Sequence, residues 1–299
     1  MNVRGYLFME KLDSTFYSNF KAYEIEFFLQ AQETSIVQAF FGPAERGAVL
    51  NLLLEQLPDL AKELHNSNDI RPYALTPLSF NNKFLVPFKG GGIKIFSGNV
   101  YSFKMKLVLK TIYEKLVNTL LNSSNLKFQI YDINFLIVSI QLSQKPLLNI
   151  FPPSENIFNK VNSPNAWNIF FKTPTQFKSK YDTIIPFPIP SFIFNNLYHT
   201  WNYFFGTPNF ITKELWFDFL EQKLYCRKHK IQTVQLKFGN SSSEIGFIGS
   251  CLIVSKEEKS PFNSFLTTLL ELGETLNVGS KRTLGFGVIN YDVRMPKTN

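Results

Sequence analysis

The chain has 299 residues, of which 44% are hydrophobic and 18% are charged, and this composition is that of a globular protein, which excludes a disordered chain. The formal net charge of +8 favours a polyanionic partner, either a nucleic acid or an anionic membrane surface. No run of 18 apolar residues occurs and charges interrupt residues 1–14, so we expect no transmembrane helix, no signal peptide and a cytoplasmic protein.

The first half of the chain is predicted to form one domain, over residues 1–145. Alternating apolar residues predict a strand at 23–31, and helical spacing then predicts a single helix from about Pro43 to His65. The later elements, in order, are strands at 72–80, 92–96 and 101–107, a helix at 108–122 and a strand at 126–142. This is the βαββαβ order of a ferredoxin-like domain.

Residues 146–165 are rich in Pro, Asn and Ser and predict a linker to a second domain over 166–299. The second half repeats the order, with a strand at 167–172, a helix at 191–205, a hairpin of 231–238 with 244–254, a helix at 262–272 and a strand at 286–293. Residues 212–228 are ambiguous and favour a helix. We therefore expect an α+β protein made of two tandem ferredoxin-like domains with antiparallel sheets.

The basic residues are unevenly distributed along the sequence. Residues 71–110 contain seven Lys or Arg and no Asp or Glu, and residues 223–238 contain five, again without an acid. A one-signed patch attracts phosphates, so these stretches favour polyanion binding, although lysines that block aggregation at strand edges would give a similar pattern. Lys104 and Lys106 alternate with apolar residues and are expected on one face of a strand, while Arg227 and Lys228 lie in the second stretch.

A glycine-rich turn, VGSKRTLGFG at residues 278–287, precedes the last predicted strand. Glycines allow positive φ and close approach of a backbone to phosphate, and successive free N–H groups can form a nest for an anion. Lys281 and Arg282 project from the same turn. A plain connection between a helix and a strand would look similar.

The two cysteines, Cys226 and Cys251, form no disulfide framework, which fits a reducing compartment. Cys226 and His229 have the gap of a ligand pair, but a structural zinc site needs four ligands and no second close pair exists. We therefore expect no metal site.

In its context, the glycine-rich turn resembles the C-terminal signature of the CRISPR-associated endoribonuclease family that processes CRISPR repeat RNA, within the RAMP superfamily. That signature is a turn of small residues ending in Gly-hydrophobic-Gly before the last strand. Other segments are similar to the family in order and spacing, namely LHNSNDIRPYALTPL at 64–78, FKTPT at 171–175, FPIP at 187–190, NNLYHTW at 195–201 and IGFIG at 245–249. The resemblance covers nearly the whole chain.

The resemblance implies cleavage of CRISPR precursor RNA, as a single strand or short hairpin, without a metal or cofactor, leaving a 5′-hydroxyl and a 2′,3′-cyclic phosphate. A homodimer and subunits of a CRISPR effector complex are further partners that it allows. We expect the RNA to contact Gly279, Lys281, Arg282, Gly285 and Gly287 of the turn, with Lys104, Lys106, Arg227 and Lys228. The alternatives are a non-catalytic RNA-binding subunit of a CRISPR ribonucleoprotein and an interaction module whose charge is incidental.

His65 lies where the family often places a catalytic histidine, and the C-terminus of a helix favours the imidazolium that a general acid needs. Arg71 follows six residues later, near the position of a lysine in related enzymes, and would stabilise the charge of the phosphorane. Some relatives carry a tyrosine on the first helix, near the position of Leu50 here, so the general base stays open. Tyr73 and Arg46 are weak candidates for it, whereas His199 and His229 are not expected to act in catalysis.

Overall fold

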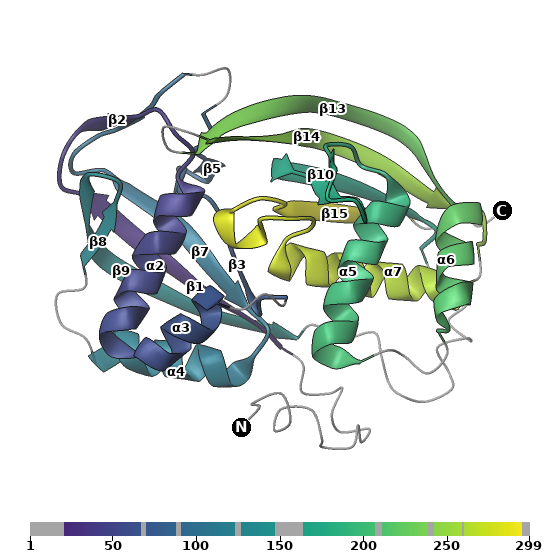
Figure 1. Ribbon diagram of the computed structural model, residues 1–299, viewed down its shortest axis with the longest axis horizontal. Helices are drawn as coiled ribbons and strands as arrows, with labels where there is room; N and C mark the ends of the chain where they lie inside the picture. Colours follow the sequence, from purple (N-terminus) through teal and green to yellow (C-terminus); the bar gives the residue numbers. More distant parts are fainter. Residues whose placement is uncertain are drawn as a thin grey trace.

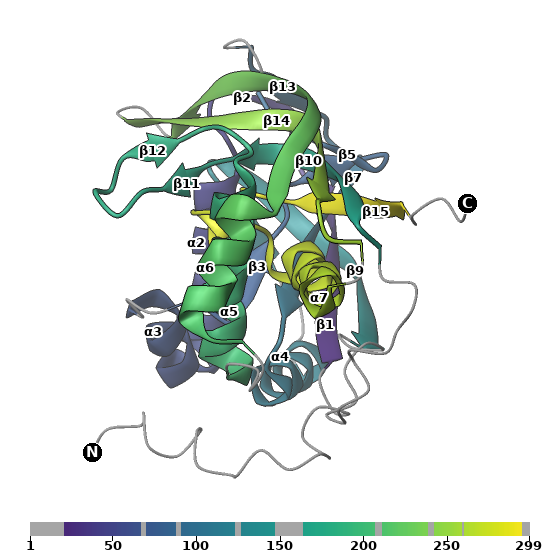
Figure 2. The ribbon, with the colours of Figure 1, turned by 90° about the vertical axis from the view of Figure 1, so that its right-hand side faces the viewer.

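Two antiparallel sheets lie next to each other, and helices cover one face of each (Figures 1 and 2). The computed structural model describes residues 21–66, 70–87, 91–122, 127–146, 164–206, 211–238, 242–258 and 260–294. Most of the predicted linker therefore lies outside the described residues. No helix in these ranges is long and apolar enough to cross a membrane.

The first sheet has the strand order β5-β4-β7-β1-β9-β8, and β3 also pairs with β7. Its strands are β1 (Lys21–Ala31), β3 (Tyr73–Leu75), β4 (Ser79–Phe80), β5 (Lys83–Phe84), β7 (Val100–Leu107), β8 (Lys127–Ile130) and β9 (Ile133–Pro146). A separate pair is formed by β2 (Ser35–Val37) and β6 (Ile93–Ile95). The alternation predicted for the first strand is confirmed, because Ile25, Phe27 and Leu29 all lie in the core.

The single helix predicted from Pro43 to His65 is wrong at one point, because the chain forms α2 (Gly42–Gln56) and then α3 (Pro58–Asn66). The break is at Leu57, which has φ −140° and ψ 64°. Proline disfavours the helical conformation in the residue before it and has no N–H to continue the ladder, so Pro58 begins a new helix. His65 therefore stands near the end of a short separate helix.

The strand predicted at 126–142 is also wrong in one respect, because it is a hairpin of β8 and β9. The turn lies at Tyr131, whose φ of 54° reverses the chain between Ile130 and Ile133. Apolar residues continue through this turn, so the sequence pattern does not mark it. The helix predicted at 108–122 is present as α4 (Lys110–Asn122).

The second sheet has the strand order β13-β14-β10-β15. Its strands are β10 (Ala166–Thr175), β13 (Leu224–Phe238), β14 (Ser242–Ser255) and β15 (Ile289–Arg294), and β11 (Phe177–Lys178) pairs with β12 (Ile184–Ile185) beside it. The helices are α5 (Pro190–Phe205), α6 (Lys213–Gln222) and α7 (Pro261–Leu276), followed by the 3-10 turn η4 (Arg282–Leu284). The helix favoured at 212–228 ends at Gln222, and the remainder begins β13.

Each half has its own large apolar core, and direct contacts join the two halves. A small cluster of Phe40, Leu236 and Phe286 combines residues from both. Close to it, the side-chain amide of Asn277, just after α7, donates to the carbonyl of Leu75 on β3 at 2.9 Å. The end of α7 and the loop that follows it are thereby fixed against the first sheet.

Candidate active site

His65 is exposed in the last turn of α3, and Arg71 folds back onto the end of that helix. The Arg71 guanidinium donates from Nε to the carbonyl of Leu64 at 3.3 Å and from Nη2 to the carbonyl of His65 at 3.4 Å. The last carbonyls of a helix have no partner within it, so Arg71 caps α3. This contact holds a permanent cation next to His65.

Two further arginines, one from each half of the chain, lie near enough to Arg71 for their charges to act on one another. Arg46, on α2, donates from Nε to the Tyr73 hydroxyl at 3.2 Å, and Arg282, in η4, donates from Nη1 to the Thr200 hydroxyl at 3.3 Å. We name Arg46, Arg71 and Arg282 the arginine cluster. None of the three forms an ion pair with a carboxylate within the part of the chain that the structure describes.

The pKa values of Arg71 and Arg282 reflect their burial first and the neighbouring like charges second. Burial, and then the charge of Arg46, lowers the pKa of Arg71. Burial, and then the charge of Arg71, lowers the pKa of Arg282 to about 10. Both side chains still carry a charge at neutral pH, and cations held together without a counter-ion make a strong site for a phosphate group.

The carboxyl group beside Arg46 in the sequence does not balance the arginine cluster. Glu45 is fully buried, and its Oε1 accepts a hydrogen bond of 2.6 Å from the backbone N–H of Leu78. Burial raises the pKa of Glu45 to about 8, so this carboxyl is mostly neutral at pH 7. Its contact ties the start of α2 to the chain after β3 without adding negative charge.

The general base stays open: of the two weak candidates, Arg46 belongs to the arginine cluster and Tyr73 is buried beside it. Tyr73 is 1% exposed, and its hydroxyl is in contact with Arg46. Leu50, near the expected position of a helix tyrosine, is buried as well. A buried phenol has no surface from which to reach a 2′-hydroxyl, so Tyr73 instead orients Arg46.

The glycines of the turn are required by the crowding of the protein's own backbone. Gly279 and Gly287 have φ of 80° and 72°, and an added Cβ would lie 2.3 Å from the Gln176 carbonyl oxygen and 1.8 Å from that of Val278, respectively. The N–H of Gly279 donates to the side chain of Asn196 at 2.8 Å. Gly285, at φ 78°, donates within η4, and Gly287 donates to the carbonyl of Pro174.

The expected anion nest is therefore not formed by the N–H groups of these three glycines, because each already has an acceptor in the protein. Contact between the turn and RNA stays a prediction.

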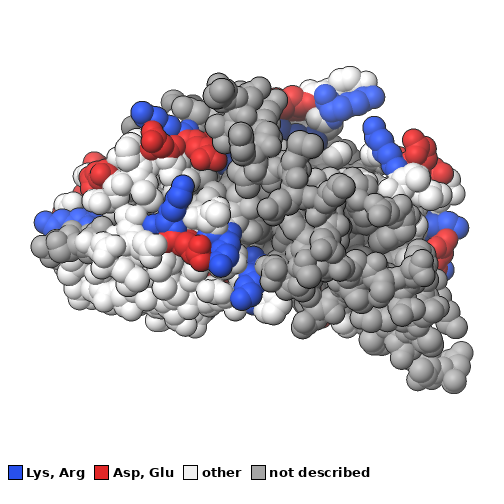
Figure 3. All heavy atoms as spheres, turned by 90° about the horizontal axis from the view of Figure 1, so that it is seen from below, with Lys and Arg blue, Asp and Glu red and all other residues white. Residues whose placement is uncertain are grey.

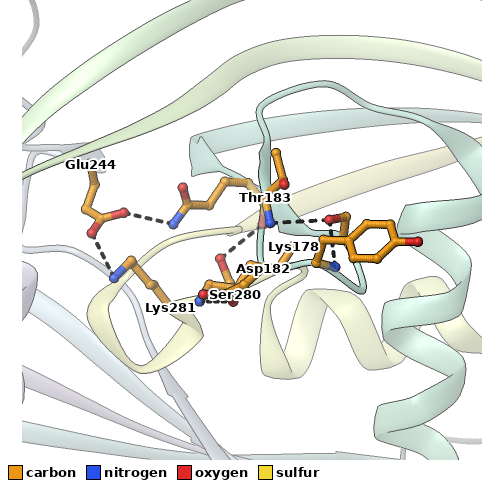
Figure 4. Close-up of polar contacts among 9 residues, drawn as sticks. Lys178, Asp182, Thr183, Glu244, Ser280 and Lys281 are labelled. Carbon is orange, nitrogen blue, oxygen red and sulfur yellow. Dashed lines mark hydrogen bonds and ion pairs between the residues drawn. The ribbon is translucent and has the colours of Figure 1, made fainter.

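The two cations of the turn contact different elements. Lys281 adopts a left-handed conformation, its Nζ lies 2.9 Å from Oε1 of Glu244 on β14, and Oε2 of Glu244 accepts from Gln176 (Figure 4). Arg282 instead reaches Thr200 on α5. The charge of Lys281 is thus balanced inside the protein, whereas that of Arg282 is not.

Lys104 and Lys106 lie on one face of β7, as predicted, but both have partners within the protein. Lys104 Nζ lies 2.7 Å from Glu24 and 3.4 Å from Glu26, both on the neighbouring β1. Lys106 donates to the carbonyl of Glu274 near the end of α7 at 2.7 Å, and burial lowers its pKa to about 8. The acid-free stretch of sequence therefore does not give an acid-free surface.

Arg227 and Lys228 are exposed on β13, the edge strand of the second sheet. The register with β14 shifts between Cys226 and Lys228, which makes Arg227 the extra residue of a bulge. Neither side chain forms an ion pair within the described residues. On the described part of the face seen in Figure 3, by contrast, basic side chains lie close to acidic ones.

The two cysteines, at which no metal site was expected, are both free thiols. A hydrogen bond from Cys251 lowers the pKa of the Cys226 thiol, with a smaller effect of His229. No group of three metal-ligating side chains is found among the residues that the structure describes.

His199 is exposed on α5, and burial together with the charge of Lys213 lowers its pKa.

Residues 169–289 match the family model for CRISPR-associated endoribonuclease Cas6. No curated protein matches the chain in sequence. Among solved structures, the product complex of the Thermus thermophilus Cas6 TTHB231 has a TM-score of 0.68 at 17% identity and covers 91% of this chain and 100% of its own.

Two other structures agree. The product complex of the Cas6 TTHA0078 has a TM-score of 0.65 at 17% identity, covering 91% of this chain and 99% of that one. A Cas6-related protein from Pyrococcus furiosus has a TM-score of 0.57 at 15% identity, with coverages of 91% and 98%. At these identities the structural matches establish the fold, a mixed α+β Cas6-like arrangement with antiparallel sheets. The resemblance to the CRISPR-associated endoribonuclease family is thus confirmed: residues 169–289 match its family model, and the chain has the fold of the Cas6 structures.

Proposed function

We propose that this protein is an endoribonuclease that cuts CRISPR precursor RNA within its repeat, without a metal ion. The observation that carries the proposal is the arginine cluster beside His65: the charge of Arg46 acts on Arg71 and that of Arg71 on Arg282, and none of the three has a carboxylate partner among the described residues. Such a cluster suits a phosphodiester better than any neutral ligand, because each planar guanidinium can donate two hydrogen bonds to phosphate oxygens.

The reaction uses the RNA's own 2′-hydroxyl as nucleophile. The bond from O2′ to phosphorus forms while the bond from phosphorus to O5′ breaks, which leaves a 2′,3′-cyclic phosphate and a 5′-hydroxyl. The arginine cluster stabilises the extra negative charge on the phosphorane oxygens. The imidazolium of His65 donates a proton to the leaving O5′, and the 2′-hydroxyl proton passes to a base that the chain does not identify.

We infer further that the chain consists of two tandem ferredoxin-like domains, residues 1–145 and 166–299, joined by residues 146–165. The strand order in each sheet supports this inference. Numbering the four main strands of each half in chain order, both sheets run second, third, first, fourth, as β3-β7-β1-β9 and β13-β14-β10-β15. The first domain would contribute His65, Arg46 and Arg71, and the second would contribute Arg282.

The comparisons give independent support. Two of the similar structures are described as product complexes and another as a substrate mimic complex, so proteins with this fold hold such ligands. The match to the Cas6 family model includes the glycine-rich turn, which supports a role of the turn in RNA processing.

One experiment tests the proposal directly. The protein is incubated in EDTA with the repeat RNA encoded beside its gene, and in parallel with the same RNA carrying a single 2′-deoxy sugar at the cut site. We expect cleavage of the first RNA and not of the second. Cleavage that stops in EDTA, or that continues on the 2′-deoxy RNA, would contradict the mechanism.

A second experiment tests the site. The His65→Ala variant is expected to slow cleavage by about 10²- to 10⁴-fold, because a positioned general acid contributes about that much, and to bind RNA as the wild type does. His199→Ala is the matched control, since His199 is an exposed helix histidine in the second half. A His65→Ala rate equal to that of the control would remove His65 from the site.

A non-catalytic RNA-binding subunit is the second candidate, and one observation favours it. Arg71 uses two of its nitrogens to cap α3, which is a structural task, and no general base is evident. Under this alternative both RNAs of the first experiment bind and neither is cut. A homodimer and an effector complex stay predictions.

A further inference from the structure

An exposed tyrosine lies at the tip of the hairpin formed by β11 and β12. Tyr181 is 78% exposed, the largest value among the exposed large hydrophobic side chains of the described residues. Such a ring contributes nothing to either core. Exposed aromatic rings are typical of surfaces that bind a partner, and the flat ring of Tyr181 suits a ligand that also has a flat face.

The turn that carries Tyr181 is held by several hydrogen bonds. The Ser179 hydroxyl accepts from the backbone N–H of Tyr181 at 3.1 Å and from that of Thr183 at 3.2 Å. Lys178 Nζ lies 2.7 Å from Asp182, which has a left-handed φ of 61° (Figure 4). A backbone fixed in this way presents the ring at a low cost in conformational entropy.

The hairpin is attached to the glycine-rich turn. Gln176, immediately before β11, accepts from the backbone N–H of Ser280 at 2.9 Å, and its side-chain amide donates to Glu244, which also binds Lys281 (Figure 4). At its base, Phe177 is buried in the core of the second half. The hairpin and the glycine-rich turn are therefore fixed to each other, and an RNA strand that contacts the turn can extend onto the hairpin.

Basic and aromatic side chains continue beyond the tip. Lys180 Nζ lies 4.8 Å from the centre of the Tyr181 ring, and the only acid of the turn, Asp182, is paired with Lys178. After β12, the ring of Phe187 lies 5.4 Å from that of His229, between the exposed Lys228 and Lys230 of β13. The hairpin thus lies between two predicted RNA contacts, the glycine-rich turn and the basic edge strand.

We propose that Tyr181 stacks on a base of the single-stranded RNA that leaves the glycine-rich turn towards β13. The exposed Lys180 lies beside the ring, where it can attract a flanking phosphate, and the ring accepts any base, because every base has a π-face. This inference rests on the proposed function, since it takes the repeat RNA as ligand. It adds a contact that selects single-stranded RNA over a closed duplex, in which the bases are already stacked.

The test is a titration of repeat RNA that carries a 2′-deoxy sugar at the cut site, so that binding is measured without cleavage. Tyr181→Ala is expected to weaken binding by about 5- to 100-fold, the range found when a stacking ring is removed. Tyr181→Phe and Tyr181→Trp keep a flat ring and are expected to bind within about 2-fold of the wild type. Tyr203→Ala, which removes another partly exposed tyrosine, is the control and should have no effect.

Unchanged binding by Tyr181→Ala would overturn the inference while leaving the proposed function intact. Equal losses for Tyr181→Ala and Tyr181→Phe would also overturn it, because the hydroxyl and not the ring would then be the contact. If the wild-type protein bound no repeat RNA, the proposed function would fail, and this inference with it. Photocrosslinking of 4-thiouridine RNA to Tyr181, mapped by mass spectrometry, gives a readout independent of affinity.

Discussion

The arginine cluster and the two lysines of β7 carry the same sign of charge in opposite surroundings. Lys104 lies between two glutamates of β1, and Lys106 binds the end of α7. The arginines donate to hydroxyls and carbonyls, and none has a carboxylate partner in the described residues. The difference teaches that a cation already balanced by the fold supports the structure, whereas unbalanced cations held together mark a place for an anionic ligand.

Among changes to the cations compared above, the largest effect is expected for Arg282→Met. Removing one preorganised cation from a phosphoryl-transfer site is expected to slow cleavage by about 10²- to 10³-fold, measured in single turnover. Stability to urea should be unchanged or higher, because an uncompensated charge is removed. Lys281→Met is the matched neighbour, and its loss should stay below about 10-fold because Glu244 already balances it. Similar losses for both variants would erase the distinction between the two kinds of cation.

Lys106→Met tests the opposite side of the comparison, through the pH dependence of stability. The folded-state pKa of Lys106 is about 8, below the ordinary 10.5, so between these values the unfolded chain binds a proton that the folded chain lacks. Wild-type stability should therefore rise with pH across this window, by up to about 3 kcal/mol, relative to the variant. The groups around Lys106 are Glu24, Lys104, Glu274 and Lys145.

Urea unfolding of both proteins at pH 7, 8, 9 and 10 measures this effect. The cleavage rate of Lys106→Met at saturating RNA is expected to match that of the wild type. A variant that keeps the pH slope would show that Lys106 is solvated, and a variant that loses cleavage would move this lysine into the site.

A double change of Arg227 and Lys228 to Ala should give a smaller effect, on RNA affinity alone. Both side chains are exposed and have no ion pair in the described residues, so they are free to neutralise phosphates. The slope of log affinity against log salt is expected to become shallower by up to about 1.4, because each phosphate of a single strand that a cation neutralises adds about 0.7 to that slope. An unchanged salt slope would exclude the β13 edge from the RNA path.

Lys104→Ala should have the smallest effect. Its ion pairs with Glu24 and Glu26 are partly exposed, so their removal should cost less than about 1 kcal/mol of unfolding free energy. RNA affinity and its salt dependence should stay at wild-type values, which filter binding at two salt concentrations would check. A clear drop in affinity would mean that the glutamates do not neutralise this strand.

Local patterns predicted most of the fold, and the errors have local causes. The alternation of β1 and the amphipathic α4 follow from side-chain periodicity. The helix break before Pro58 was missed because apolar residues keep helical spacing on both sides of the proline, and that spacing predicted one continuous helix. The turn at Tyr131 has no signal, because a non-glycine residue adopts the left-handed conformation there.

The candidate site was predictable only in part. His65 and Arg71 were proposed from the positions that the family resemblance gives them, and the structure brings the Arg71 side chain onto the end of the helix that carries His65. The neighbours that decide the role of each cation lie far away, such as Glu24 for Lys104 and Thr200 for Arg282. Those contacts depend on how strands pair and how the two halves dock, which no local pattern encodes. The burial of Tyr73 likewise becomes visible only once β3 is placed beside β7.

The docking of Asn277 onto Leu75 has a consequence for the order in which the protein becomes active during synthesis. Translation produces His65, Arg46 and Arg71 early, and Arg282 only after the second half has followed. If cleavage needs all three arginines, a ribosome-bound first half has no working nuclease, and neither does a product of premature termination. In that case the contact that brings η4 beside β3 delays catalysis until the second half of the chain has folded onto the first half.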